Sequence, residues 1–171
     1  MSPHQQAQRD TTTYDMEWIM TRAVTITGTR STGHRGLDSY AELFTRYLAP
    51  FAGDQTRFYI GGAVGIDSLS LLWLAGNTHA QITIVVPGTV RQQPPEAQQA
   101  ITRSSGRITE VVELQAAELG SPAFHARNRW MVDHSDIVIG FPLIGPQGTA
   151  GTWQTLNYGA EQGKPHLIVP V

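Results

Sequence analysis

The chain has 171 residues, which is enough for one domain with a full hydrophobic core and too few for two independent domains. Its 12 basic and 14 acidic side chains give a net charge of −2, which excludes the strongly basic surface of the usual nucleic-acid binder. Cysteine is absent, so disulfides, thiolate metal sites and a cysteine nucleophile are excluded as well.

The first twenty residues differ in character from the rest. Residues 1–20 are rich in Gln and Thr, so we predict a mobile N-terminal segment ahead of a single domain over residues 21–171. They contain no basic start followed by an apolar segment, and no apolar run approaches the ~18 residues of a membrane span. We therefore expect a cytoplasmic protein with no membrane partner.

Short apolar runs alternate with helical patterns from residue 23 onward. β-branched and aliphatic residues predict strands over residues 23–28, 57–60, 81–86, 108–114, 136–141 and 167–169. Helical spacing and turn residues predict helices over residues 37–48, 66–75, 95–104, 122–134 and 152–162. Because strands separated by helices pair in parallel, we predict a doubly wound, mainly parallel α/β sheet flanked by helices, which is a Rossmann-like fold. Its site is expected at the carboxyl ends of the strands.

A turn rich in glycine and hydroxyl groups follows the first predicted strand. Gly28, Thr29 and Arg30 begin this turn, and Gly33 ends it. Its backbone N–H groups and the positive end of the next helix dipole can bind an anion. The alternative is an ordinary strand-to-helix turn, because short glycine patterns are permissive.

Three glycines follow the second predicted strand, at Gly61, Gly62 and Gly65, and Asp67 stands in the first turn of the next helix. Glycine lets the backbone come close to a ligand. The Asp67 carboxylate either caps the helix, where the dipole favours it, or accepts a hydrogen bond from a ligand such as a sugar hydroxyl. The triple glycine favours a binding role over simple turn chemistry.

The third candidate group combines a polar helical segment with a glycine-rich loop. Its proposed binding residues are Arg127, Asn128, Gly148, Thr149, Gly151 and Thr152. The loop lies between a strand and a helix, where an anion-binding loop is expected. Because Arg127 and Arg129 are two residues apart, at most one of them points into a site, unless both belong to a solvated helix face.

Other common chemistries lack their motifs. The six histidines show no metal-ligand spacing, and neither a phosphate-loop lysine motif nor a Gly-x-Ser-x-Gly elbow occurs. We therefore expect no metal site, no intrinsic cofactor and no serine-hydrolase activity.

Taken in order, the candidate segments resemble the DNA-processing protein A (DprA/Smf) group of the SLOG superfamily. Residues 26–30 are similar to its strand-end Gly-Ser/Thr-Arg, and residues 61–67 to its Ser-Gly-x-Ala-x-Gly-Ile-Asp. Phe124 with residues 127–129 resembles its Phe-x-x-Arg-Asn-Arg, and residues 148–152 resemble the glycine-rich loop of the superfamily. The resemblance spans residues 24–171 and implies a Rossmann-like domain that binds nucleotides or nucleic-acid phosphates.

The superfamily also contains LOG-type phosphoribohydrolases, in which a helical Arg and a Glu after the glycine-rich loop are implicated in catalysis. Arg127 matches that Arg and is the candidate catalytic residue if this chain is an enzyme. Gln154 stands at the Glu position, and an amide cannot act as a carboxylate base. The resemblance therefore disfavours N-glycosidic hydrolysis by this mechanism.

Three hypotheses about function remain open. The first is a protein that binds a phosphorylated nucleotide or nucleotide derivative without LOG-type hydrolysis. In it, the loop at residues 148–152 and Arg30 or Arg127 hold the phosphate, and Asp67 and Asn128 contact the sugar or base. The second hypothesis is a nucleotide-processing enzyme that uses Arg127.

The third hypothesis is a DNA-processing module that binds single-stranded DNA. Charge disfavours it, because the acids Asp67, Asp133 and Asp136 occur in the same segments as the candidate arginines and offset their field. The apolar run at residues 69–73 leaves two interpretations of assembly open, a homo-oligomer that covers it or burial inside one chain.

Overall fold

One parallel sheet forms the centre of the computed structural model, which describes residues 22–145 and 150–171. Its six strands are β1 (Ala23–Gly28), β2 (Arg57–Ile60), β3 (Gln81–Val86), β4 (Glu110–Glu113), β5 (Ile137–Phe141) and β6 (His166–Ile168). They lie in the order β4-β3-β2-β1-β5-β6, and every neighbouring pair is parallel. The predicted doubly wound α/β fold is confirmed.

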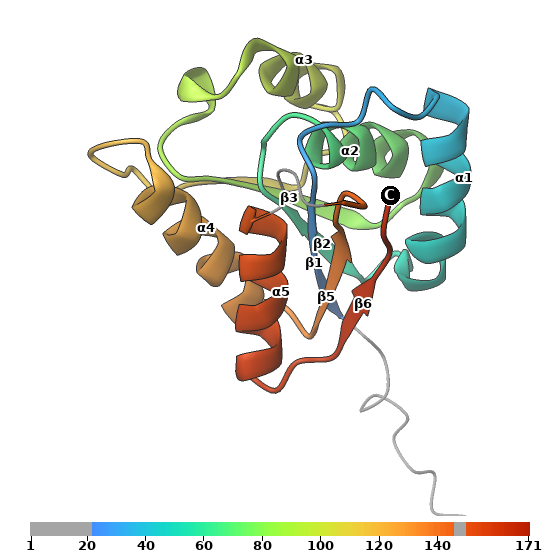
Figure 1. The fold of residues 1–171 in the computed structure, drawn as a ribbon. Helices are drawn as coiled ribbons and strands as arrows, with labels where there is room; N and C mark the ends of the chain where they lie inside the picture. Colours follow the sequence, from blue (N-terminus) through green and yellow to red (C-terminus); the bar gives the residue numbers. More distant parts are fainter. Residues whose placement is uncertain (1–21, 146–149) are drawn as a thin grey trace, which may run out of the picture.

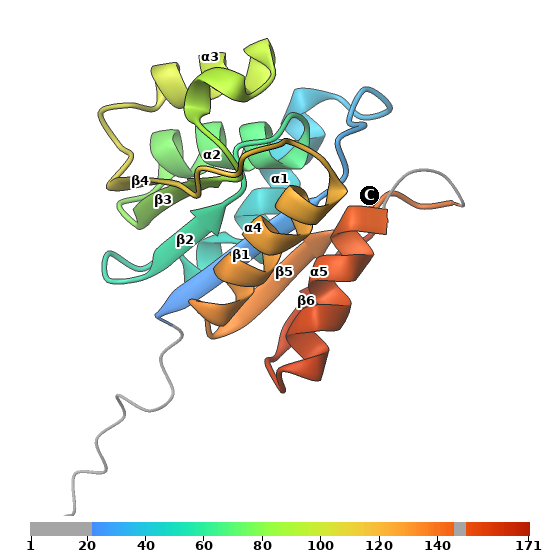
Figure 2. The ribbon, with the colours of Figure 1, turned by 90° about the vertical axis from the view of Figure 1, so that its left-hand side faces the viewer.

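Helices cover both faces of this sheet. They are α1 (Leu37–Tyr47), α2 (Ile66–Asn77), α3 (Pro95–Arg103), α4 (Ser121–Asp133) and α5 (Ala150–Glu161), with short 3-10 turns η2 (Ala49–Phe51) and η3 (Val90–Gln92). Helices α1 and α2 lie on one face, with α3 against α2, and α4 and α5 lie on the other (Figures 1 and 2). Double coverage explains why the inner strands are continuous apolar runs.

The main core lies between the sheet and the α1/α2 layer. There the Phe44 ring of α1 meets the Phe141 ring of β5 edge to face, with ring centroids 5.5 Å apart. Smaller clusters lie under α4, around Tyr59 and Met131, and between α4 and α5, around Leu156. Most of the apolar surface is therefore buried within this one sheet-and-helix unit.

The structure decides how two segments of the sequence are packed. The run at residues 69–73 lies on α2, which packs against the sheet, α1 and α3, so only Leu72 is markedly exposed, at 36%. The run thus gives no reason to infer a homo-oligomer. Residues 88–95, between β3 and α3, contain η3 and the buried side chain of Gln93, so they are not an open loop. The predicted N-terminal segment at residues 1–20 lies outside the described residues.

The topology places a crevice at the carboxyl ends of β1 and β5. These two strands are neighbours, but α1 follows β1 onto one face and α5 follows β5 onto the other (Figure 2). Open α/β sheets bind their ligands at such a switch point. Among the described ranges, no helix is long and apolar enough to cross a membrane.

Candidate functional site

A cavity of about 410 Å³ opens beside the carboxyl end of β1, at this switch point. Its walls come from the end of β1, the loop before α2, one face of α4 and the first turn of α5. The lining residues are Ile26, Thr27, Gly28, Arg30, Ala63, Asp67, Ser121, Phe124, His125, Arg127, Asn128, Met131, Ala150, Gly151 and Thr152. Polar groups thus converge from four separate segments, as is typical of small-molecule and nucleotide sites.

The structure divides the predicted site residues into two groups. Seven line the cavity: Gly28, Arg30, Asp67, Arg127, Asn128, Gly151 and Thr152. Four are not among the lining residues: Thr29, Gly61, Gly62 and Gly65. Gly148 and Thr149 lie outside the described residues.

Arg127 is the most firmly anchored of the lining side chains, and it is only 5% exposed. Its Nη1 donates to the carbonyl oxygens of Gly61, just after β2, and of Val85 in β3. Its Nε donates to Oδ1 of Asn128 at 2.8 Å. Nη2 makes no hydrogen bond with any residue in the described ranges, so it is available to donate to a ligand in the cavity.

Asp67 is the charge that faces Arg127, and it is 7% exposed. Its Oδ2 accepts a hydrogen bond from the backbone N–H of Ala63 at 3.1 Å, so it ties the loop before α2 to the helix. Burial raises the pKa of the Asp67 carboxyl, and the Arg127 guanidinium opposes that rise. The carboxyl is therefore held by the protein while one side of it lines the cavity.

The raised pKa of Asp67 predicts a pH dependence of stability. Between the unfolded pKa near 4 and the higher folded pKa, the folded state binds more protons than the unfolded state, so the free energy of unfolding falls as pH rises. Urea denaturation from pH 4 to pH 8 should show this fall in the wild type relative to Asp67→Asn. Asp38→Asn, at an exposed position of α1, should instead run parallel to the wild type, and parallel curves for Asp67→Asn would contradict the prediction.

Gly61 separates these two side chains. A Cβ at Gly61 would lie 2.3 Å from Nη1 of Arg127 and 2.7 Å from Oδ2 of Asp67. Both side chains thus occupy the space that a larger residue would need. The sequence suggested that glycines in this loop admit a ligand, whereas Gly61 admits two side chains of the protein itself.

Arg30 and Phe124 meet at the cavity although they are far apart in the sequence. The guanidinium carbon of Arg30 lies 5.3 Å from the centroid of the Phe124 ring, within range of a cation–π interaction. Arg30 is exposed. The pair therefore presents a planar cation and an aromatic face to the same opening.

The two arginines of α4 diverge, as their spacing predicts. Arg127 is buried at the cavity, whereas Arg129 is exposed and lines a separate groove with α5. Gln154 also lines that groove, and its Oε1 accepts a hydrogen bond from Asn128 Nδ2 at 3.4 Å. The residue at the LOG-type Glu position therefore supports Asn128 from outside the cavity.

Ser121, His125 and Met131 also line the cavity, although none of them was predicted from the sequence. Together with Phe124 and Asn128 they follow three- and four-residue spacing, so one face of α4 forms a cavity wall. That spacing was present in the sequence. From the sequence alone, residues 121–131 look like an ordinary helix of mixed polarity. Only the packing of α4 against the sheet shows which of its faces points inward.

The acids that were expected to cancel the arginine field do not gather at the cavity. Oδ2 of Asp136 accepts hydrogen bonds from the backbone N–H groups of Arg22 and Ala23, at the amino-terminal edge of the sheet. Asp133 accepts a hydrogen bond from Tyr158 Oη at the far end of α4. Of these three acids, Asp67 alone lines the cavity, so Asp133 and Asp136 do not offset the arginines there as expected. In the described ranges, no three His, Asp or Glu side chains gather to form a metal site.

A parallel sheet with a polar cavity at its switch point places the chain among Rossmann-like α/β proteins. The sequence model of the family described as DNA recombination-mediator protein A matches residues 14–171. The chain therefore belongs to this family, and the resemblance to the DprA/Smf group is confirmed.

Two solved structures share the fold. One is DNA processing protein A from Helicobacter pylori, described for its single-stranded DNA binding mode, with a TM-score of 0.64 and 20% identity. The match covers 88% of this chain and 66% of that one, so this chain spans somewhat less than two thirds of that structure. The other is TM1055, with a TM-score of 0.57 and 13% identity, covering 85% of this chain and 72% of that one. No curated protein matches the sequence.

Proposed function

We propose that this chain is a DNA-processing domain that binds single-stranded DNA and holds one nucleotide of the strand in the cavity beside β1. The observation that carries the proposal is the convergence of Arg30, Phe124, Arg127 and Asn128 on one opening. Arginine forks bind phosphate oxygens, and aromatic faces stack on bases of any sequence. The cavity thus offers both kinds of contact that a single strand needs.

The first turn of α5 provides a further phosphate contact. Ala150, Gly151 and Thr152 line the cavity at the amino-terminal end of this 12-residue helix, where the helix dipole favours an anion. Ser121 contributes a hydroxyl from the opposite wall. A phosphate between these groups would also lie within the field of Arg30 and Arg127.

Two findings support the proposal from outside the site. The chain belongs to the recombination-mediator family, and the similar Helicobacter pylori protein is described by how it binds single-stranded DNA. In addition, Asp133 and Asp136 lie away from the cavity, so they do not offset its arginines.

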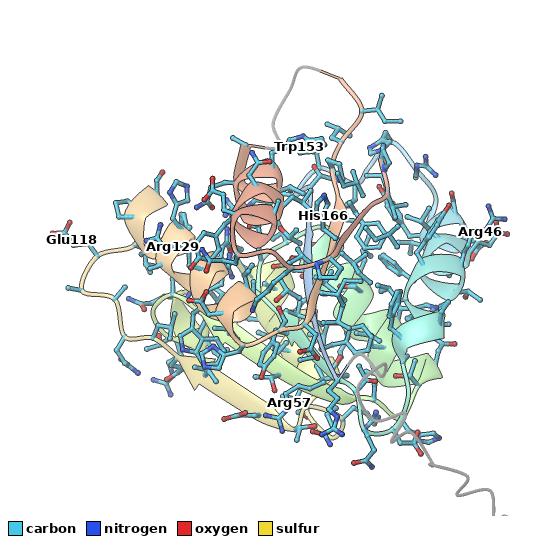
Figure 3. All side chains as sticks on the ribbon, turned by 90° about the horizontal axis from the view of Figure 1, so that it is seen from below. Arg46, Arg57, Glu118, Arg129, Trp153 and His166 are labelled. Carbon is cyan, nitrogen blue, oxygen red and sulfur yellow. The ribbon has the colours of Figure 1, made fainter. Side chains whose placement is uncertain are left out.

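The experiment is a fluorescence-anisotropy titration of labelled dT20 across several salt concentrations. Arg30→Ala should weaken binding by about tenfold or more and reduce the salt slope by about 0.7, because one phosphate contact is lost. Arg46→Ala is the matched control, since Arg46 is exposed on α1, away from α4 and α5 (Figure 3). Absence of wild-type binding, or equal effects of the two substitutions, would contradict the proposal.

A small phosphorylated nucleotide is the second candidate ligand. It is favoured by the net charge of −2, which limits how many phosphates one chain can neutralise. Calorimetry with dTMP separates the two: affinity for the mononucleotide equal to that for dT20 would favour the small ligand. Release of free base is not expected in either case, because Gln154 replaces the LOG-type Glu and lies outside the cavity.

A further inference from the structure

A groove of about 420 Å³ lies between α4 and α5, next to the cavity. Arg129 of α4 lines one side, and Trp153, Asn157 and Tyr158 of α5 line the other. Ala150 lines both the groove and the cavity, so the two meet at the first turn of α5.

Trp153 is unusual among the aromatic residues of the described ranges because its large side chain is 41% exposed. It projects from the start of α5, and Arg129 projects from the neighbouring helix (Figure 3). Arg129 makes no hydrogen bond or ion pair with any residue of the described ranges. The groove therefore presents an exposed aromatic face and a guanidinium that has no hydrogen-bond partner among the described residues.

Two acids lie at this groove, toward the carboxyl-terminal part of α5 rather than at its first turn. Asp133 accepts a hydrogen bond from Tyr158 Oη at 2.8 Å. Glu161, the last residue of α5, also lines the groove, two turns beyond Trp153. Neither carboxylate thus stands at the junction with the cavity, where Trp153 and Ala150 lie.

We propose that this groove holds the nucleotide next to the one in the cavity, with its base stacked on Trp153 and a phosphate of the same strand bound by Arg129. The inference rests on the proposed function. It commits to single-stranded DNA because the groove adjoins the proposed binding cavity at Ala150 and pairs an aromatic face with a cation. Stacking of this kind tolerates any base, which suits a protein that binds a strand regardless of sequence.

The test is anisotropy of labelled dT20 with three variants of the full chain. Trp153→Ala should weaken binding about 5- to 150-fold, the range typical of losing one stacked base, while Trp153→Phe keeps most of the affinity. Arg129→Gln should reduce the salt slope by about 0.7, and the control Arg46→Gln should leave it unchanged. Because the side chain of Trp153 is partly exposed, circular-dichroism melting should show wild-type stability for both Trp153 variants.

Four outcomes separate the two proposals. If the wild type does not bind dT20, the proposed function and this inference fail together. If Arg30→Ala weakens binding but the Trp153 and Arg129 variants do not, only the groove proposal is overturned. If Trp153→Phe weakened dT20 binding as much as Trp153→Ala, the groove proposal would also be overturned, because a phenyl ring can still stack on a base. Binding of dTMP should be unchanged in Trp153→Ala, since that ligand occupies the cavity alone. If Trp153→Ala weakened dTMP binding as much as dT20 binding, Trp153 would belong to the cavity site and the groove proposal would be overturned.

Discussion

Replacing Arg127 with methionine should lower the free energy of unfolding by about 3–5 kcal/mol, the usual cost of removing one partner from a buried charged network. Methionine fills much of the volume of the side chain but donates no hydrogen bond. The carbonyl oxygens of Gly61 and Val85 and Oδ1 of Asn128 would each lose a charged donor. Asp67 would lose the cation that offsets its burial.

The measurement is urea denaturation of the wild type, Arg127→Met and Arg129→Met at neutral pH. Arg129 provides the matched control, because it lies two residues away on the same helix and is exposed. Surface substitutions of this kind usually change stability by no more than about 0.5 kcal/mol. Equal stability of the two variants would show that Arg127 is not the structural anchor that its contacts describe.

The double variant Asp67→Asn/Arg127→Met tests whether the two side chains act together. If Arg127 serves mainly to compensate the buried carboxyl, the second substitution should recover part of the lost stability. Simple addition of the two effects would assign the loss to the hydrogen bonds of Arg127 with the backbone instead.

The order of strands and helices could be predicted because both faces of the sheet are covered, which makes each inner strand a continuous apolar run. The errors in the predicted strands lie at the strand ends. Ile108 and Val169 were assigned to strands, but β4 begins at Glu110 and β6 ends at Ile168. Both residues are apolar because they pack against the core, next to a strand end. Burial and strand pairing impose the same residue preference, so the sequence cannot separate them.

The site could be predicted only to the level of its segments. Glycine and arginine marked the right loops and helix, yet Gly61 serves the contact between Arg127 and Asp67 behind the cavity. Whether a glycine admits a ligand or another part of the same chain depends on what approaches it in space. The contact between Arg30 and Phe124 joins segments that are distant along the chain, so no local pattern could reveal it.

Gly65 shows how strongly the two glycine-rich segments depend on each other. It precedes α2 with φ +77° and ψ −127°, a conformation that side-chain-bearing residues rarely adopt. A Cβ there would lie 2.5 Å from the carbonyl oxygen of Thr29 and 2.6 Å from Cα of Arg30. The same carbonyl oxygen accepts the backbone N–H of Ile66 at 3.0 Å. The atoms that a Cβ at Gly65 would meet belong to the backbone, so no movement of a side chain can relieve the overlap.

Gly65→Ala should therefore lower the free energy of unfolding by about 3 kcal/mol or more, from the strained conformation and the overlap together. Gly76→Ala is the matched control within α2, because a Cβ at Gly76 meets nothing within 4 Å. Alanine is the better helix former, so this control should gain about 0.5–1 kcal/mol. Urea denaturation compares the two, and similar effects of both substitutions would contradict the argument. Since Arg30 adjoins the overlap, any folded Gly65→Ala protein should also bind dT20 more weakly than Gly76→Ala, which links the packing behind the cavity to the proposed binding in front of it.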